Sequence, residues 1–547
     1  MRKMARKKMR KRKTPKVKVT KETSVAGTIE LKSPDLKVAV EEAPVFQATA
    51  YEEAVAATEE STGKSQAGIV QENPKIKVLI AASEGMPFVV TGGLGEVIGS
   101  LPKAIMKENS GAFDVRVILP LYESIGYEER KQMEFLGHFD VNLAWRKQYC
   151  GVFRTEKNGV TYYFIDNEYY FKRSRAYGYY DDGERYAFFS KAVLDSIPFM
   201  DFSPDLIHCH DWQTALIPVY LHYNYHHVQA KSIFTIHNIE YQGQMDLNVI
   251  EDVFGLPKEA GAALEYRGCA NLLKAAIECA YRVNTVSPTY AAELRDDYFA
   301  KGLAEIIQKN QWKMRGILNG IDVDSYNPET DASIFVPYNA ETIQKKKENK
   351  AELQRLVHLP VEEHVPVVAI ISRLVAHKGV DLIAAIMEQL VNENVQVVVL
   401  GIGDQKYEDY FRGLQERYPE KVASLLCFNQ DLSRKIYAGA DLFLMPSKSE
   451  PCGLAQMIAS RYGTVPVVRA TGGLRDTIQD CTHGEGNGFV FESYNAHELL
   501  NAVHRALHLY KDEASWNRLV KWIMTLDFSW EKSAREYEQL YLEVNHI

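Results

Sequence analysis

The sequence predicts an α/β protein built from two doubly wound domains, each a parallel sheet covered by helices. Short continuous apolar runs alternate with amphipathic stretches along most of the chain, which is typical of strands buried on both faces of a parallel sheet. The chain has 547 residues, more than one hydrophobic core normally holds, and its 46% apolar and 25% charged composition is that of a globular protein. We therefore expect two domains in tandem, with a ligand held in the cleft between them.

The first series begins near Lys75. KVLIAA (77–82) is a buried strand, TGGLGEVIGSLPKAI (91–105) is a glycine turn that runs into an amphipathic helix, and DVRVILP (114–120) is the next strand. This order places a ligand at the first turn. The glycines at 93, 95 and 99 do not form GxGxxG, and GxxxxGK[ST] does not occur, so NAD and P-loop ATP chemistry are disfavoured.

The alternation continues to about residue 315. Residues 135–172 alternate and are rich in aromatic residues, which predicts antiparallel strands inserted in the sheet. Three further strands end in polar residues: DLIHCHD (205–211), SIFTIHN (232–238) and YRVNTVS (281–287). A helix is expected over about 262–280, before the last of these.

A second series follows the turn at 316–322 and a lysine-rich helical stretch. Its strands are expected at VPVVAIISR (365–373), VQVVVLGIG (395–403), ADLFLMPS (440–447) and TVPVVRA (464–470), with a helix over 405–418. Residues 446–476 organise this half: a strand end, a polar turn, a helix, a short strand and a second TGGL turn that opens another helix. Such helix starts offer unpaired N–H groups to an anion.

The start of the chain differs in charge from the remainder. Residues 1–21 contain twelve Lys and Arg and no acid, although the whole chain has a net charge of −8. Residues 22–73 lack sustained periodicity, so residues 1–73 are predicted to be a disordered extension with a basic start. Binding to nucleic acid or an anionic surface is the alternative, but interleaved aromatics are missing and we expect no nucleic-acid partner. Scarce serine disfavours a transit peptide.

The cysteines and the hydropathy of the chain indicate its cellular location. The seven cysteines are scattered without a CxxC pair, which disfavours a disulfide framework or a zinc site. Apolar runs stay well short of the ~18 residues of a membrane span. We expect a soluble protein of the bacterial cytoplasm without a membrane partner, a plastid being the minor alternative.

Two cations follow the strand at 365–371. Arg373 and Lys378 lie five residues apart in SRLVAHKG, beyond the carboxyl end of the strand, where a guanidinium fork and an ammonium can grip a diphosphate. A solvated loop with two ordinary charges is the alternative. Their place at the strand end favours the diphosphate.

Glu450 lies at the start of the helix in the organising stretch. Alone it would be interpreted as a first-turn acid stabilised by the helix dipole. The turn at 447–450, the helix start at 452–454 and the turn at 471–474 are expected to converge at one sheet edge. An acid there can bind sugar hydroxyls or stabilise an oxocarbenium-like centre while N–H groups hold a leaving phosphate. Glycoside hydrolases need two paired carboxylates, and the sequence offers no second acid near Glu450.

Polar residues also end two strands of the first domain. His208 and His210 share a strand face in HCHD, yet no third ligand follows at a zinc-like spacing, so a metal is disfavoured. We interpret Asp211, His237 and Asn238 as polar site residues; a buried structural histidine is the alternative.

Nine segments together carry a family resemblance. They are TGGLGEV, HCHDWQTAL, TIHNIEYQG, NTVSPTYAAEL, GILNGID, SRLVAHKG, ADLFLMPSKSEPCGLAQ, GTVPVVRATGGLRDT and DFSWEKSAREYEQLY. In this order, over about residues 75–547, the chain resembles bacterial glycogen synthase and plant starch synthase, glycosyltransferase family 5.

The resemblance implies a GT-B fold, that is, two Rossmann-like domains with a deep cleft. The implied parts are the extension at 1–73, an acceptor domain at 74–315, a nucleotide-sugar domain at 316–525 and a helix at 526–547 that returns to the first domain. It also implies transfer of glucose from ADP-glucose to the non-reducing end of an α-1,4-glucan such as glycogen, with retention, without a cofactor and without a metal.

Site residues carried over by matching motif fall into two groups. The implied catalytic residues are Glu450, His237, Arg373, Lys378 and Asp211. The implied substrate-binding residues are Gly92, Gly93, Glu96, Asn238, Asn319, Phe428, Cys452, Gly453, Leu454, Thr471 and Gly472. Within this set Arg373 and Lys378 hold the distal phosphates, Gly92 and Gly93 approach the diphosphate, and Phe428 stacks on adenine.

Three positions bear on the assignment. The first family motif usually begins with lysine and carries aspartate where this chain has Val90 and Glu96. Loss of the lysine removes a cation near the donor, which leaves a UDP-glucose user and an inactive glucan-binding homologue as alternatives. Ile458, eight residues after Glu450, breaks the Glu-x7-Glu pattern of sucrose and trehalose-phosphate synthases.

Overall fold

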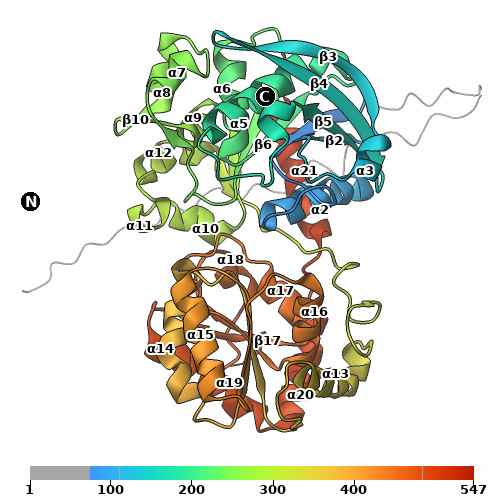
Figure 1. The fold of residues 1–547 in the computed structure, drawn as a ribbon, viewed down its shortest axis with the longest axis vertical. Helices are drawn as coiled ribbons and strands as arrows, with labels where there is room; N and C mark the ends of the chain where they lie inside the picture. Colours follow the sequence, from blue (N-terminus) through green and yellow to red (C-terminus); the bar gives the residue numbers. More distant parts are fainter. Residues whose placement is uncertain (1–73, 110, 483, 547) are drawn as a thin grey trace, which may run out of the picture. The chain divides into compact units, whose positions relative to one another are not determined.

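The structure is a computed structural model that describes residues 74–109, 111–482 and 484–546 (Figure 1). The predicted extension at residues 1–73 lies outside the described residues. The remainder forms two α/β lobes, each with its own hydrophobic core. None of the helices in the described part combines the length and apolar character needed to cross a membrane.

The first lobe contains, among the described residues, a nine-stranded sheet. Along the sheet, every strand from β12 across to β5 pairs in parallel with its neighbours in that run. β4 and β3 extend the edge beyond β5 in antiparallel fashion, so the predicted antiparallel insertion is confirmed. In sheet order the strands are β12 (Met314–Gly316), β11 (Arg282–Thr285), β7 (Lys231–Ile236), β6 (Leu206–His210), β1 (Ile76–Ala81), β2 (Phe113–Pro120), β5 (Val160–Asp166), β4 (Arg146–Lys157) and β3 (Glu134–Leu143).

Helices cover this sheet, and the predicted helix after the TGGL turn is observed as α2. The first-lobe helices are α2 (Gly93–Glu108), α3 (Tyr127–Lys131), α4 (Glu168–Phe171), α5 (Asp182–Asp195), α6 (Leu216–Tyr223), α7 (Val249–Asp252), α8 (Gly261–Leu264), α9 (Leu272–Cys279), α10 (Pro288–Glu293), α11 (Asp297–Ala300) and α12 (Ala304–Lys309).

The prediction of one helix over 262–280 is wrong. The segment contains α8, then β9 (Glu265–Tyr266) and β10 (Cys269–Asn271), and only then α9. Arg267 and Gly268 between the two short strands both have positive φ, which makes a tight turn that no helix can contain. β10 pairs also with β8 (Gln244–Met245), a contact distant in sequence.

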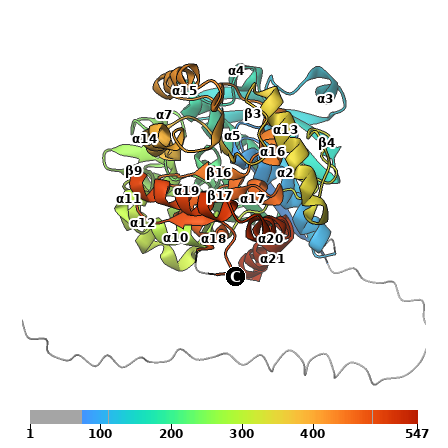
Figure 2. The same cartoon turned by 90° about the horizontal axis from the view of Figure 1, so that it is seen from below.

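The second lobe is built on a six-stranded parallel sheet within the described residues. Its strands in sheet order are β15 (Val422–Leu425), β14 (Gln396–Leu400), β13 (Val367–Ile371), β16 (Leu442–Met445), β17 (Val465–Arg469) and β18 (Phe489–Phe491). Its helices are α13 (Lys346–Leu356), α14 (Val380–Leu390), α15 (Gln405–Arg417), α16 (Gln430–Gly439), α17 (Ala455–Arg461), α18 (Gly472–Thr477), α19 (Ala496–Tyr510) and α20 (Glu513–Met524). Figure 2 shows α17, β17 and α19 from below.

The last helix, α21 (Trp530–His546), packs into the core of the first lobe (Figure 1). Tyr541 Oη lies 2.8 Å from His208 Nδ1, and Asn284 Nδ2 donates to Tyr537 Oη at 3.1 Å. The last helix therefore belongs structurally to the first lobe. The exact limits of the four predicted parts stay a prediction.

Each sheet has one point at which the strand order reverses. In the first lobe the chain adds β2 on one side of β1 and later adds β6 on the other. In the second lobe β14 and β16 flank β13 in the same way. Ligands of open parallel sheets bind outside the carboxyl ends of the strands at such a point. The fold therefore directs attention to the residues that follow β1, β6, β13 and β16.

Candidate active site

The loop after β1 leads into the first TGGL turn. α2 begins at Gly93 and its N-cap residue, Gly92, provides no side-chain hydrogen bond, so the first backbone N–H groups of a 16-residue helix have no side-chain cap. Gly92 and Gly93 are exposed, and a Cβ built on Gly93 would meet nothing within 4 Å. The turn therefore has open space in front of a helix start, which suits the approach of an anion.

Glu84 supports this turn, and reasoning from sequence missed it. Its carboxylate accepts a hydrogen bond from the Thr91 backbone N at 2.5 Å, and its side chain is buried. Burial raises the pKa of Glu84. The available signal was an acid three residues after a strand whose last four residues are buried, at the carboxyl end where ligands bind.

The end of β6 forms a cluster with the end of β7, in which His210 is buried and Asp211 and His237 are half-buried. His210 Nδ1 lies 2.8 Å from His237 Nε2, and Asp211 Oδ1 accepts a hydrogen bond from the His237 backbone N at 2.8 Å. Burial lowers the pKa of His237 to about 3 and raises the pKa of Asp211 to about 7. His237 is therefore an uncharged hydrogen-bonding group at neutral pH.

His208, two residues before His210 on the same strand face, belongs to the same cluster. Their ring centroids are 4.1 Å apart, and His208 Nε2 lies 2.6 Å from Thr235 Oγ1. Burial lowers the pKa of His208 to about 3. In the described part of the chain, no three His, Cys, Asp or Glu side chains lie close enough together to hold a metal ion.

The second lobe contributes a charged pair. Lys378, which follows β13, donates from Nζ to Glu450 Oε2 at 2.6 Å, and Glu450 follows β16. Ser447 Oγ donates to the same carboxylate oxygen at 2.9 Å. Glu450 and Ser447 are buried, and Lys378 is partly exposed. The sequence did not predict that Lys378 and Glu450 would contact each other directly.

Arg373 lies beside this pair without a carboxylate partner in the described ranges. Its Nη2 atom is 3.4 Å from His377 Nε2, and its side chain is exposed. Burial, together with the nearby charges of Lys378 and Arg373, lowers the pKa of His377. The carboxyl end of β13 thus presents an uncompensated guanidinium next to an ammonium, an arrangement suited to a diphosphate.

The helix start predicted at 452–454 lies slightly before the observed helix. α17 begins at Ala455, and Gly453 has φ +74°, so Cys452 to Leu454 form the turn that leads into it. Burial raises the pKa of the Cys452 thiol to about 12, which makes this sulfur a poor nucleophile.

The second TGGL turn differs from the first because its donors are occupied. Glu293 Oε1, from the first lobe, accepts hydrogen bonds from Thr471 Oγ1 at 2.9 Å and from the Gly472 backbone N at 3.0 Å. Gly473 N donates to the Glu450 carbonyl oxygen at 3.1 Å. Binding of substrate by Thr471 and Gly472 stays a prediction, and it would require displacement of Glu293.

The remaining predicted residues lie in different surroundings. Tyr326 Oη donates to Glu96 Oε1 at 3.4 Å, and burial raises the pKa of Glu96. Asn238 Oδ1 accepts from the backbone N of Glu240 at 3.0 Å. Asn319 is buried, and its Oδ1 atom has no partner in the part of the chain that the structure describes.

Phe428 is 79% exposed at the end of the second-lobe sheet that carries β15. An exposed aromatic ring can stack on a base. No described contact joins Phe428 to the Lys378 and Glu450 pair, so its role as an adenine platform stays a prediction.

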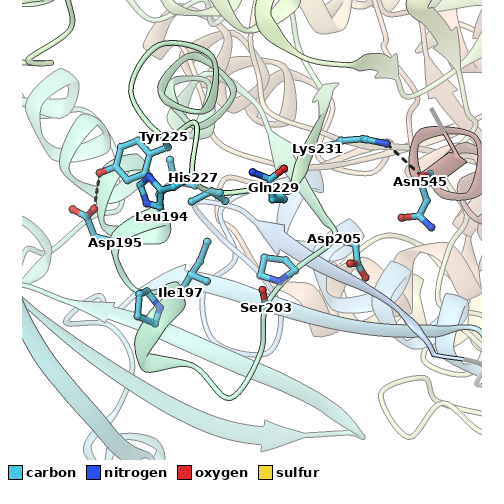
Figure 3. Close-up of a pocket in the computed structure, with 13 residues that line it drawn as sticks. Leu194, Asp195, Ile197, Ser203, Asp205, Tyr225, His227, Gln229, Lys231 and Asn545 are labelled. Atoms are coloured by element: carbon cyan, nitrogen blue, oxygen red, sulfur yellow. Dashed lines mark hydrogen bonds between the residues drawn. The ribbon is translucent and has the colours of Figure 1, made fainter.

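A cavity of about 510 Å³ lies elsewhere, at the amino ends of β6 and β7 (Figure 3). Asp205 on its wall accepts a hydrogen bond from Lys77 N at 2.8 Å, and Lys231 donates to the Val544 carbonyl oxygen at 3.0 Å. These contacts fix the start of β1 and the end of α21. The cavity therefore opens at the sheet edge opposite the predicted site residues.

Comparison with known proteins covers most of the chain. The family model described as starch synthase catalytic domain matches residues 77–309, and the model described as glycosyl transferases group 1 matches residues 357–521. Glycogen synthase from Anoxybacillus flavithermus is 45% identical over 477 residues, which cover 86% of this chain and 98% of that protein. The chain belongs to the glycogen and starch synthase family.

Other family members agree. Glycogen synthase from Desulforamulus reducens is 46% identical over 474 residues, covering 85% of this chain and 98% of its own length. The catalytic domain of starch synthase IV from Arabidopsis thaliana, solved with ADP and acarbose bound, is 35% identical with a TM-score of 0.80, covering 87% of this chain and all of that one. The resemblance found in the motifs is confirmed, and the protein is a glycosyltransferase.

A more distant neighbour shows the fold alone. Sucrose-phosphate synthase from Thermosynechococcus elongatus is 18% identical with a TM-score of 0.56, covering 86% of this chain and 99% of that one. The predicted GT-B fold is confirmed by both structures. Val90, at the position where the resemblance implies a lysine, is 38% exposed directly before the open turn.

Proposed function

We propose that this glycosyltransferase transfers glucose from ADP-glucose to the non-reducing end of an α-1,4-glucan, with retention of configuration and without a cofactor or metal. The observation that carries the proposal is the group Arg373, Lys378 and Glu450 at the reversal point of the second sheet. The relatives named as glycogen synthases and the neighbour solved with ADP and acarbose support both substrate classes.

The charges suit a diphosphate leaving group. Arg373 and Lys378 neutralise the departing nucleoside diphosphate, whose negative charge grows as the bond from glucose C1 to oxygen breaks. Binding of the diphosphate competes with Glu450 for the Lys378 ammonium, which frees the Glu450 carboxylate to accept hydrogen bonds from glucose. The uncapped start of α2 supplies further N–H groups on the other lobe.

Retention by attack on the same face fits the groups present. The acceptor hydroxyl oxygen forms the new bond to C1, and its proton passes to the departing phosphate oxygen. Cys452, the thiol nearest to Glu450 along the chain, is held protonated by burial, and the low pKa of His237 keeps that ring neutral. Neutral His237 and the backbone-bound Asp211 then orient hydroxyl groups of the transferred glucose.

Val90 favours keeping two alternatives, a UDP-glucose user and a glucan-binding protein without activity. The decisive experiment measures nucleotide release and incorporation of labelled glucose with ADP-glucose and with UDP-glucose, each with and without glycogen primer. We expect primer-dependent release of ADP that exceeds release of UDP. Preferential release of UDP would replace the donor assignment.

Val90→Lys separates the inactive alternative. In an active enzyme the added ammonium lies close to the donor, so the variant changes the KM of the donor by a few fold while the wild type already transfers glucose. A wild type without detectable transfer, together with a Val90→Lys variant that gains it, would establish the inactive alternative.

A further inference from the structure

Two short helices, one from each lobe, lie against each other where the lobes meet. α10 belongs to the first lobe and α18 to the second, and Figure 1 shows them as neighbours. Four hydrogen bonds join their ends. Glu293 at the end of α10 accepts from Thr471 and Gly472 at the start of α18. Asp476 near the end of α18 accepts from Thr289 N at 2.9 Å and Thr289 Oγ1 at 2.6 Å.

The positions of the Glu293 and Asp476 carboxylates are favourable only because α10 and α18 lie against each other. An acid at the C-terminal end of a helix is disfavoured by the dipole of that helix, and both Glu293 and Asp476 occupy such positions. Each lies instead at the first turn of the other helix, where an anion is favoured and the backbone N–H groups lack intrahelical partners. The two lobes thus cap each other's helices.

One of these caps reaches the backbone of Glu450. Gly472 has φ +45°, and a Cβ built on it would lie 1.9 Å from the Glu450 carbonyl oxygen, so the turn packs directly on that peptide. The same carbonyl accepts the Gly473 N–H at 3.1 Å. Ser287 Oγ, at the start of α10, donates to the Pro451 carbonyl oxygen at 2.7 Å. The peptide that carries Glu450 therefore rests on a turn held by the first lobe.

We propose that Glu293 is a positioning residue for Glu450: its carboxylate holds the Thr471–Gly472 turn, and that turn holds the Glu450 backbone in place for transfer. The inference rests on the proposed function, because it assigns to Glu293 a part in the same reaction. Burial raises the pKa of Glu293, while the Gly472 and Thr471 hydrogen bonds and the nearby Arg469 lower it. The position is thus built to keep an acceptor at this turn.

The test compares Glu293→Ala with Glu293→Gln. Alanine removes the acceptor, whereas the glutamine Oε1 can still accept from Thr471 and Gly472. We expect Glu293→Ala to lower kcat by roughly tenfold or more, as small displacements of a reacting group do, with the acceptor KM unchanged. Glu293→Gln should restore most of kcat. Glu305→Ala, an exposed acid on α12 of the same lobe, is the matched control and should keep wild-type activity.

Amide hydrogen exchange provides a readout that does not depend on activity. In Glu293→Ala we expect faster exchange over residues 450–454 and 471–474 than in the wild type, and near wild-type exchange in Glu293→Gln. Thr471→Val, which removes one of the two donors, gives an intermediate effect and serves if the alanine variant does not fold. Wild-type kcat and exchange in Glu293→Ala would overturn the inference, as would a Glu293→Gln variant as impaired as alanine.

Failure of the proposed function is distinguishable from failure of this inference. If the wild type transfers no glucose, the proposed function fails, and the exchange comparison still decides whether Glu293 holds the peptide of Glu450. If the wild type is active and the exchange pattern is indifferent to Glu293, only the positioning role fails.

Discussion

The sequence TGGL occurs twice, and its two copies have opposite surroundings. At 91–94 the first three residues are exposed, α2 starts without a side-chain cap, and a Cβ on Gly93 would meet nothing within 4 Å. At 471–474 the turn is buried, Glu293 occupies its donors, and a Cβ on Gly473 would lie 2.1 Å from the Cys452 carbonyl oxygen. At the first copy Glu84 of the same lobe binds the Thr91 N–H and the start of α2 stays open, whereas at the second copy a carboxylate of the other lobe binds the Thr471 hydroxyl and the Gly472 N–H.

The difference shows how the two lobes divide the work. The open turn has a valine, Val90, before it and no cation of its own, whereas the second lobe places Arg373 and Lys378 beyond β13. Under the proposed function, the charge that binds the donor therefore comes mainly from the second lobe. The first lobe contributes neutral hydrogen-bonding groups and an unobstructed helix start, since burial keeps His237 uncharged.

The largest expected effect tests this division of charge. Lys378→Ala removes the ammonium that is to neutralise the leaving diphosphate, and we expect transfer to fall by roughly 10²-fold or more. Glu450→Gln keeps a hydrogen-bonding group beside Ser447 but loses the charge, and should impair transfer to a similar degree. Incorporation of labelled glucose into glycogen measures both. Lys406→Ala, an exposed lysine on α15, is the control and should keep wild-type rates.

Near wild-type transfer by either Lys378→Ala or Glu450→Gln would contradict the assignment of charge to the second lobe. Unfolding curves are needed alongside, because removal of one partner from a buried ion pair leaves the other uncompensated.

A matched pair of glycine substitutions tests the two turns directly. Gly473→Ala must push the Cys452 peptide aside, so we expect a loss of roughly 1–3 kcal/mol in the free energy of unfolding. Gly93→Ala has open space, so its stability should stay within about 0.5 kcal/mol of the wild type. Its methyl group lies where the diphosphate is proposed to approach, which should raise the donor KM. Urea unfolding and steady-state kinetics measure the two effects; equal destabilisation by both would break the comparison.

The last prediction concerns Asp211, a half-buried acid of the first lobe whose effect shows only as a change with pH. The folded state raises the pKa of Asp211 to about 7, above its ordinary value near 4, so folding favours the protonated form. The stability that Asp211 contributes is full below about pH 4 and is lost as pH rises to about 7. Asp211→Asn removes this titration. As the pH rises from 5 to 8, the wild type should therefore lose roughly 2–3 kcal/mol of unfolding free energy that Asp211→Asn keeps.

Urea unfolding of both proteins at pH 5, 6.5 and 8 measures the difference. A constant gap between wild type and Asp211→Asn across this range would contradict a raised pKa for Asp211 and would weaken the description of the first lobe as the neutral half.

Local pattern was sufficient for most of the fold. Continuous apolar strands, glycine turns and amphipathic helices are properties of short segments, so both parallel sheets and the antiparallel edge could be predicted from them, whereas the return of α21 to the first lobe was implied by the family resemblance. The hairpin within 262–280 could not, because β10 pairs with β8 and that pairing depends on a distant segment.

The candidate site divides in the same way. The sequence by itself determined that Arg373, Lys378, Glu450 and His237 follow buried strands, since the residues at a strand's carboxyl end are fixed by chain order. Tertiary structure alone decided which of them touch. Lys378 binds Glu450 across 72 residues, and Glu293 fills the second TGGL turn across 179. The first contact depends on the strand order that places β13 beside β16, and the second depends on how the two lobes pack; no local pattern of residues records either.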